Sequence, residues 1–190
     1  MATLLISLIG GFLFYILLKS KNLYIKYFSR IIREVIIGTP LLVMVFLVVY
    51  VFGIRVDITN KELLGIIALS IYMIPYIANS FESAIEVISD KQFIVMDLYN
   101  FSFYQKYVYV IFPQIIKPLL PSLLNNLSNI IKGSALLKII SVSEIAYVIT
   151  VISNKTYASI EGYLIMWIMY LIITIPLSLI AKYLAKRFEK

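Results

Sequence analysis

The chain has 190 residues, of which 62% are hydrophobic and 14% charged, whereas a soluble domain carries about 45–50% apolar and about 25% charged residues. The excess apolar surface indicates an integral membrane protein in contact with the lipid bilayer. Cys and His are absent, which excludes a disulfide framework, a zinc site of the usual kind and a Cys–His or Ser–His nucleophile. The net charge of +7 lies in Lys and Arg residues beside apolar runs, so we expect no nucleic-acid partner.

Long apolar runs predict the transmembrane helices, because a helix needs about 17–20 apolar residues to cross the hydrocarbon. Four such runs are present, at residues 2–18, 35–54, 63–81 and 162–181. The first lacks the basic residues and the cleavage site of a signal peptide, so we expect it to be retained as a helix.

A fifth apolar stretch, at residues 107–143, is interrupted by Lys, Pro and Asn residues. A lipid-facing helix would not tolerate them, since each Lys near the bilayer centre costs roughly 2.5–3.5 kcal/mol on insertion scales. We therefore predict a spanning helix at 114–132, packed inside the bundle or lining a wet cavity, and a short non-spanning helix at 143–153. The expected fold is a single all-α membrane domain over residues 1–190 with about five transmembrane helices.

The distribution of Lys and Arg predicts the orientation in the membrane. The first loop holds Lys19, Lys21, Lys26, Arg30 and Arg33, and the tail holds Lys182, Lys186, Arg187 and Lys190. The connections expected on the opposite side hold only Arg55, Lys61, Lys138 and Lys155. Because basic loops remain in the cytoplasm, five spans place the N-terminus outside and the C-terminus in the cytoplasm of the cell membrane. The connection 89–112 then also lies in the cytoplasm.

The connection 89–112 carries signals of its own structure. Residues 92–99 read as a short helix, and Asn100 follows, a residue type that tolerates the left-handed conformation that ends helices. Ser102 and Gln105 have the spacing of a capping box that begins another helix. The sequence therefore predicts a helix–turn–helix elbow.

Two interpretations of the elbow remain open from the pattern alone. Its apolar and aromatic residues suit an amphipathic segment resting on lipid headgroups. They equally suit a docking surface for a soluble partner, with the apolar side chains as anchors. Pro113 either ends the elbow or begins the next span.

Short motifs lie in order from about Arg33 to the C-terminus. They are Glu34-Val-Ile-Ile-Gly38-Thr39-Pro40-Leu41-Leu42-Val43, Gln92-Phe93, Phe112-Pro113-Gln114, Lys132-Gly133-Ser134-Ala135-Leu136, Val142-Ser143-Glu144-Ile145 and a closing helix at 163–184. In order and spacing they resemble the permease subunits of ABC-type polar amino acid importers, the family with the binding-protein-dependent transport fold.

This resemblance implies a type I importer permease that works as a dimer with a second permease subunit, identical or different. It implies that the elbow inserts into a groove on a cytoplasmic ABC ATPase subunit and that an extracytoplasmic solute-binding protein delivers the solute. The chain lacks a Gly-rich phosphate loop, so we expect no enzyme activity and no cofactor of its own. The residues expected to couple to the ATPase are Gln92, Phe93, Val95, Leu98, Asn100, Phe101 and Pro113.

Polar residues in or near the third to fifth spans are candidates for the solute pathway. They are Asn79, Glu82, Asn125, Asn129, Lys132 and Ser134. Lys132, helped by Ser134, would attract a ligand carboxylate or else snorkel to the interface. Asn125 and Asn129 share a helix face and would line the path or bond neighbouring helices.

Two further motifs have simple structural interpretations. Glu82 would contact a ligand or lie solvated at its helix end. Gly38, Thr39 and Pro40 mark a bend where the second helix enters the membrane.

The chain departs from the family pattern at several positions. Ile94-Val95-Met96 stands where the family has Glu-Ala-Ala, Asn100 replaces a Gly, and Gly133 replaces an Asp. Asn79 and Glu82 stand in a third-helix segment that differs from the family's Ala-Glu-Ile-x-Arg-Gly. The alternative function is therefore a divergent subunit that assembles the complex without translocating solute. An intramembrane enzyme would need a constellation of catalytic residues inside the spans, and we find none in the sequence. A secondary transporter would usually show inverted repeats, and we find none in the five predicted spans.

Overall fold

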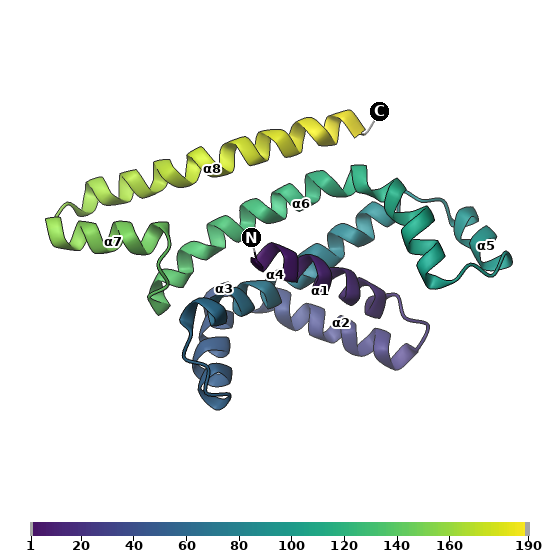
Figure 1. Ribbon diagram of the computed structural model, residues 1–190, viewed down its shortest axis with the longest axis horizontal. Coiled ribbons are helices and arrows are strands. Elements are labelled where there is room, and N and C mark those ends of the chain that lie inside the picture. Colours follow the sequence, from purple (N-terminus) through teal and green to yellow (C-terminus); the bar gives the residue numbers. More distant parts are fainter. Residues whose placement is uncertain (1, 189–190) are drawn as a thin grey trace.

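A computed structural model describes residues 2–188, which are helical with no strand (Figure 1). Lys190, counted in the basic tail, lies outside these residues. The elements are α1 (Ala2–Leu18), α2 (Leu23–Gly38), α3 (Leu41–Phe46), η1 (Leu47–Gly53), α4 (Lys61–Ile85), α5 (Asp90–Leu98), η2 (Gln105–Ile111), α6 (Phe112–Ser134), η3 (Ala135–Ile140), α7 (Ile145–Thr156) and α8 (Ser159–Phe188). η1 and η2 are π-helical and η3 is a 3₁₀ helix. The all-α prediction is confirmed.

Three helical segments are long and apolar enough to cross a membrane, namely α4, the continuous helix Gln105–Ile140 and α8. The pair α2 and α3–η1 supplies a fourth crossing if it is one broken span, and α1 is a shorter apolar helix of 17 residues. These three segments, the broken span and α1 together agree with the prediction of about five spans. The predicted helices at 63–81, 114–132 and 162–181 lie within α4, α6 and α8, and the short helix predicted at 143–153 is α7.

The prediction of one continuous helix over 35–54 is wrong, because the chain bends by 106° between α2 and α3–η1. Thr39 and Pro40 have extended backbone conformations at this point. Pro has no N–H to continue the hydrogen-bond ladder and disfavours helix at the residue before it. The bend predicted at Gly38, Thr39 and Pro40 is confirmed, but residues 35–38 belong to the preceding helix.

That preceding helix, α2, occupies most of the segment taken from the sequence as a basic loop. Asn22 begins it, since its Oδ1 accepts hydrogen bonds from the backbone N–H of Tyr24 at 2.9 Å and of Ile25 at 3.4 Å. Apolar residues between its charges are exposed, including Tyr24, Tyr27 and Phe28. An amphipathic helix of this kind lies along a membrane surface.

The core forms where α1 crosses α4. A Cβ added at Gly11 would lie 2.6 Å from Cγ2 of Ile77, and one at Gly10 would lie 2.8 Å from Cδ1 of Ile74. Glycine therefore permits the close approach of the two helices. Around this crossing, buried side chains of α1, α4 and α6 form one apolar cluster, and α3–η1, α4 and η3 form a second.

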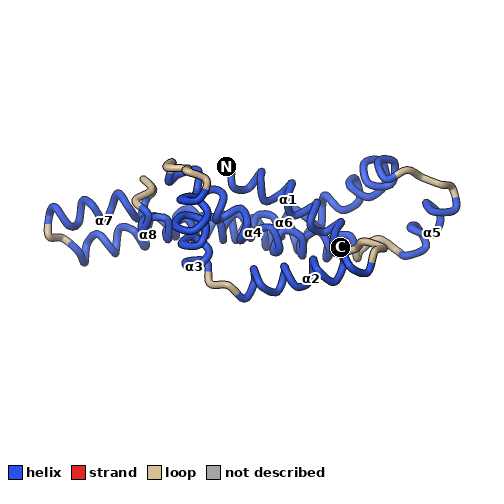
Figure 2. The backbone as a smooth tube through the Cα atoms, turned by 90° about the horizontal axis from the view of Figure 1, so that it is seen from below, coloured by secondary structure: helices blue, strands red, loops and turns tan. Residues whose placement is uncertain are grey.

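The two ends of the molecule differ. The connection between α1 and α2, the elbow around α5 and the C-terminal end of α8 lie toward one end, and α7 lies toward the other (Figures 1 and 2). The segments richest in Lys and Arg are thus at the same end as the elbow.

Candidate functional site

The elbow begins with a tightly terminated α5. The backbone N–H of Asn100 donates to the carbonyl of Asp97 at 3.0 Å, and the N–H of Phe101 donates to the carbonyl of Met96 at 2.9 Å. Asn100 has φ = 51°, in the left-handed region. These bonds form a Schellman motif with Asn in the position that glycine usually occupies. The predicted helix end at Asn100 is confirmed.

The second half of the elbow begins with the predicted capping box. The N–H of Ser102 donates to Oε1 of Gln105 at 2.8 Å, and the N–H of Gln105 donates to Oγ of Ser102 at 3.3 Å. The Lys106 ammonium pairs with the Asp97 carboxylate across the turn. Its hydrogen bond and charge lower the pKa of the Asp97 carboxyl below its usual range.

One face of the elbow is fixed to the bundle. Met96 is buried and Phe93 is half-buried, and both pack against the α1–α4–α6 cluster. Nε2 of Gln114 on α6 donates to Oε1 of Gln92 on α5 at 3.1 Å. The position of α5 is therefore set by the helix that follows it.

The other face of the elbow is apolar and exposed. Leu98 is 74% exposed, Val95 49% and Phe101 37%, and Ile94 and Pro113 are exposed too. Ile94, where the resemblance would place a Glu, adds an exposed aliphatic side chain to this face. An exposed apolar surface on a rigid support is typical of a protein docking site.

A buried polar seam joins α4 to α6. Oγ of Ser80 accepts hydrogen bonds from Oγ of Ser122 at 2.6 Å and from Nδ2 of Asn126 at 2.8 Å, and it donates to the carbonyl of Tyr76 at 3.0 Å. Ser80 and Asn126 are both buried. Such bonds hold spanning helices together. Asn126, rather than the expected Asn125 or Asn129, makes the interhelical contact.

A cavity of about 300 Å³ lies between α3, α4 and α6. Its lining includes Leu41, Tyr72, Tyr76 and Asn129. The Tyr76 hydroxyl donates to the Tyr72 hydroxyl at 3.2 Å. An apolar cavity with a few convergent polar groups is the usual form of a small-solute site. Asn129 is the one predicted pathway residue that lines this cavity.

The other predicted pathway residues lie apart from it. Asn79 is half-buried on α4, whereas Asn125 and Lys132 are exposed on α6. Oγ of Ser134 donates to the carbonyl of Ile131 at 2.8 Å within its own helix. The structure therefore does not gather the six candidates at one site.

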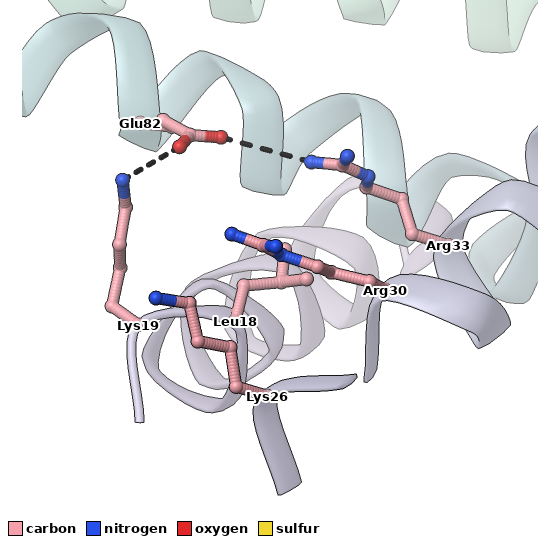
Figure 3. Close-up of a pocket in the computed structure, with 6 residues that line it drawn as sticks. All are labelled: Leu18, Lys19, Lys26, Arg30, Arg33 and Glu82. Atoms are coloured by element: carbon pink, nitrogen blue, oxygen red, sulfur yellow. Dashed lines mark ion pairs between the residues drawn. The ribbon is translucent and has the colours of Figure 1, made fainter. Parts of the chain in front are cut away.

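Glu82 is an ion-pair partner at the elbow end of α4. Its Oε1 lies 2.7 Å from Nζ of Lys19 and its Oε2 lies 3.9 Å from Nη1 of Arg33 (Figure 3). Glu82 thus links α4 to Lys19, which follows α1, and to Arg33 within α2.

Two motif residues have structural roles that the sequence did not reveal. Oε1 of Glu144 accepts a hydrogen bond from the N–H of Tyr147 at 2.7 Å and so begins α7, while its Oε2 accepts one from the Tyr170 hydroxyl of α8 at 2.8 Å. A Cβ at Gly133 would lie 2.9 Å from Cδ2 of Leu41, so the Leu41 side chain of α3 packs directly against Gly133.

Sequence reasoning missed the seam and both tyrosines of the cavity. Their spacing was the available signal: Tyr72, Tyr76 and Ser80 follow at i, i+4 and i+8, and Ser122 and Asn126 at i and i+4. Residues so spaced share one helix face. Two polar faces on neighbouring spans predict contact between them.

Several apolar spanning helices, with a structured elbow at one end, make this a multi-pass membrane protein. Residues 2–190 match the family described as the binding-protein-dependent transport system inner membrane component. The chain belongs to this family.

Individual relatives agree with the family. The chain is 32% identical to the probable glutamine ABC transporter permease protein GlnM of Bacillus subtilis, over 83% of this chain and 73% of the relative. It is 26% identical to the putative glutamine transport system permease protein GlnP of Rickettsia conorii, over 95% and 84% of the two chains.

Solved structures share the fold. A chain of the crystal structure of an amino acid ABC transporter with histidines superposes with a TM-score of 0.82 and 26% identity, over 98% of this chain and 87% of that chain. The inward-facing MetNI methionine ABC transporter superposes with a TM-score of 0.73 over 98% and 92%, and at 13% identity it shows the fold alone.

Proposed function

We propose that this permease moves a polar amino acid, with glutamine as the first solute to test, using ATP hydrolysed by separate ABC ATPase subunits. The solute class is supported by the glutamine permeases among the relatives. In this proposal a solute-binding protein delivers the amino acid to the outer face, a second permease subunit completes the pathway, and the elbow end lies in the cytoplasm.

The exposed face of α5 carries the coupling part of the proposal. Val95 and Leu98 project from α5, whose inner face is packed on the bundle, and Phe101 projects from the turn that ends it, which backbone hydrogen bonds hold. Because the elbow is rigid, a force applied to these side chains passes to α6 rather than deforming the loop. The ATPase groove would take the apolar side chains as anchors.

The cavity beside Tyr72, Tyr76 and Asn129 supports the transport part. Its volume of about 300 Å³ lies at the lower end of the range for small-ligand sites, roughly 300–1,000 Å³, and suits an amino acid. The two hydroxyl groups and the Asn129 amide would bind its polar groups. The expected roles of Asn79, Asn125, Lys132 and Ser134 along the rest of the pathway remain predictions.

Co-purification from detergent tests the coupling. The permease is expressed with the host's ABC ATPase subunits as wild type, Leu98→Asp, Phe101→Asp and Tyr157→Asp. Tyr157 is 94% exposed and lies after α7 at the other end, so it controls for the added charge. We expect the ATPase to be lost from the two elbow variants and retained by the control. Retention by all three variants would refute docking at the elbow.

Uptake of labelled glutamine into cells tests translocation separately. A permease that retains its ATPase and imports glutamine, competed by other polar amino acids, fits the proposal. ATPase binding without uptake of any polar amino acid would identify the non-translocating assembly subunit instead.

A further inference from the structure

A pocket rich in basic residues lies beside the ends of α1 and α4. Its volume is about 270 Å³. We call it the basic pocket, and it is lined by Leu18, Lys19, Lys26, Arg30, Arg33 and Glu82 (Figure 3). Four cations thus surround one carboxylate.

The α2 helix supplies three of the four cations. Lys26, Arg30 and Arg33 follow at i, i+4 and i+7, which places them on one helix face. Figure 3 shows their side chains extending from α2 toward the space below Glu82. Lys19 reaches the same space from the end of α1.

The carboxylates nearby neutralise only part of this charge. Glu82 pairs with Lys19 at 2.7 Å and with Arg33 at 3.9 Å, and Glu34 pairs with Arg33 at 3.1 Å. Among residues 2–188, neither Lys26 nor Arg30 has a carboxylate oxygen within 4.0 Å. Like charges one turn apart repel each other, so a bound anion would stabilise this arrangement.

The surroundings of the basic pocket resemble a membrane–water interface. On α2, Tyr24, Tyr27 and Phe28 are 86%, 66% and 64% exposed. Aromatic residues with this exposure on an amphipathic helix are typical of the headgroup level of a bilayer. The apolar α1 ends at Leu18, in the pocket wall, which places the pocket at the same level.

We propose that the basic pocket binds a phosphate ester, supplied by the headgroup of an anionic phospholipid in the adjacent leaflet. Arg30 would bind the phosphate oxygens through its planar guanidinium group and Lys26 through its ammonium group. Basic pockets between spanning helices are suited to anionic headgroups. The lipid would connect α2 to the α1–α4 crossing, at the end of the molecule that carries the elbow.

Native mass spectrometry of the whole chain in a neutral detergent tests the proposal. Dioleoyl-phosphatidylglycerol is titrated against dioleoyl-phosphatidylcholine, and sn-glycerol 1-phosphate is titrated as the soluble phosphate. The test variant is Lys26→Gln/Arg30→Gln, which leaves every ion pair of the pocket in place. The control variant is Lys182→Gln/Lys186→Gln, which removes two basic residues near the C-terminal end of α8.

We expect wild type and the control to prefer the anionic lipid, and the test variant to lose about 10- to 30-fold in affinity for it alone, given about 1 kcal/mol per basic residue at a membrane surface. Equal losses in both variants, or none in either, would overturn the proposal. Glycerol phosphate that displaces the lipid at equal affinity would overturn the lipid as the source. Thermal unfolding without lipid verifies that the test variant is folded, and we expect the variant to be at least as stable as wild type because the repelling charges are removed.

Discussion

The contact between Gly11 and Ile77 makes the packing of α1 on α4 open to direct test. In Gly11→Ala the new Cβ would lie 2.6 Å from Cγ2 and 2.8 Å from Cβ of Ile77, and 3.2 Å from the backbone nitrogen of Ala78, whereas ordinary contact begins at 3.4 Å. Neither Cβ nor backbone atoms can move aside by a rotamer change, and Ile77 is fully buried. The helices must therefore separate along the crossing.

We expect Gly11→Ala to lower the free energy of unfolding by about 1–3 kcal/mol, the usual cost of overpacking a tight core. Gly10→Ala should cost less, because its clash at 2.8 Å is with Cδ1, the far end of the Ile74 side chain. Gly38→Ala meets nothing within 4 Å, so it should not destabilise the protein and should gain up to about 1 kcal/mol of helix propensity.

Reversible unfolding in mixed micelles, followed by circular dichroism as the fraction of denaturing detergent rises, measures these differences. A double variant with Ile77→Ala removes the 2.6 Å contact, so the cost of Gly11→Ala should fall in that background. If Gly11→Ala and Gly38→Ala are equally stable, the close crossing of α1 and α4 is not a feature of the folded protein.

Three further outcomes are expected. Asn126→Ala removes one hydrogen bond to Ser80 and should cost about 0.6–2 kcal/mol in the same unfolding assay, with less effect in a Ser80→Ala background. Asn100→Gly should leave the elbow intact, whereas Asn100→Val should destabilise it by about 1–2 kcal/mol, because φ = 51° places a β-branched Cβ against its own carbonyl. Hydrogen exchange of the backbone amides of residues 96–105 measures both effects. The pKa of Asp97 is lowered in the folded protein by its pairing with Lys106. The ion pair therefore stabilises the fold fully at pH values above the ordinary carboxyl pKa, and this stability is lost only as the pH falls through the lowered pKa. The protection of the elbow amides from hydrogen exchange should therefore be constant around neutral pH in wild type and lower at that pH in Asp97→Asn. Equal protection in the two proteins would mean that the ion pair does not hold the turn.

The elbow could be predicted in detail because its signals are local. The Asn100 helix end and the Ser102–Gln105 capping box depend on residues at most five positions apart. Such bonds form from the sequence itself, whatever the bundle does around them.

The seam and the cavity could not be predicted in the same way, because they depend on which face of α6 meets α4. Three asparagines lie within one and a half turns of α6, and the sequence gives no direct sign that Asn126 faces inward. Packing decides it: Ile115, Leu119, Asn126 and Ile130 are buried, whereas Asn129 lines the open cavity beside α4 and Asn125 is exposed. The break at Pro40 was located correctly but its size was not, because a hydropathy window measures composition and not direction.

The helix from Gln105 to Ile140 is unbroken over 36 residues and carries the elbow at its first end. The helix is not straight, because its axis turns where η2 joins α6 and because Pro118 and Pro121 lie inside α6 (Figures 1 and 2). Its far end, η3, packs against α3–η1 and α4 in the second apolar cluster. One continuous stretch of backbone thus connects the docking surface proposed at the elbow to packing at the opposite end of the bundle, without passing through a loop.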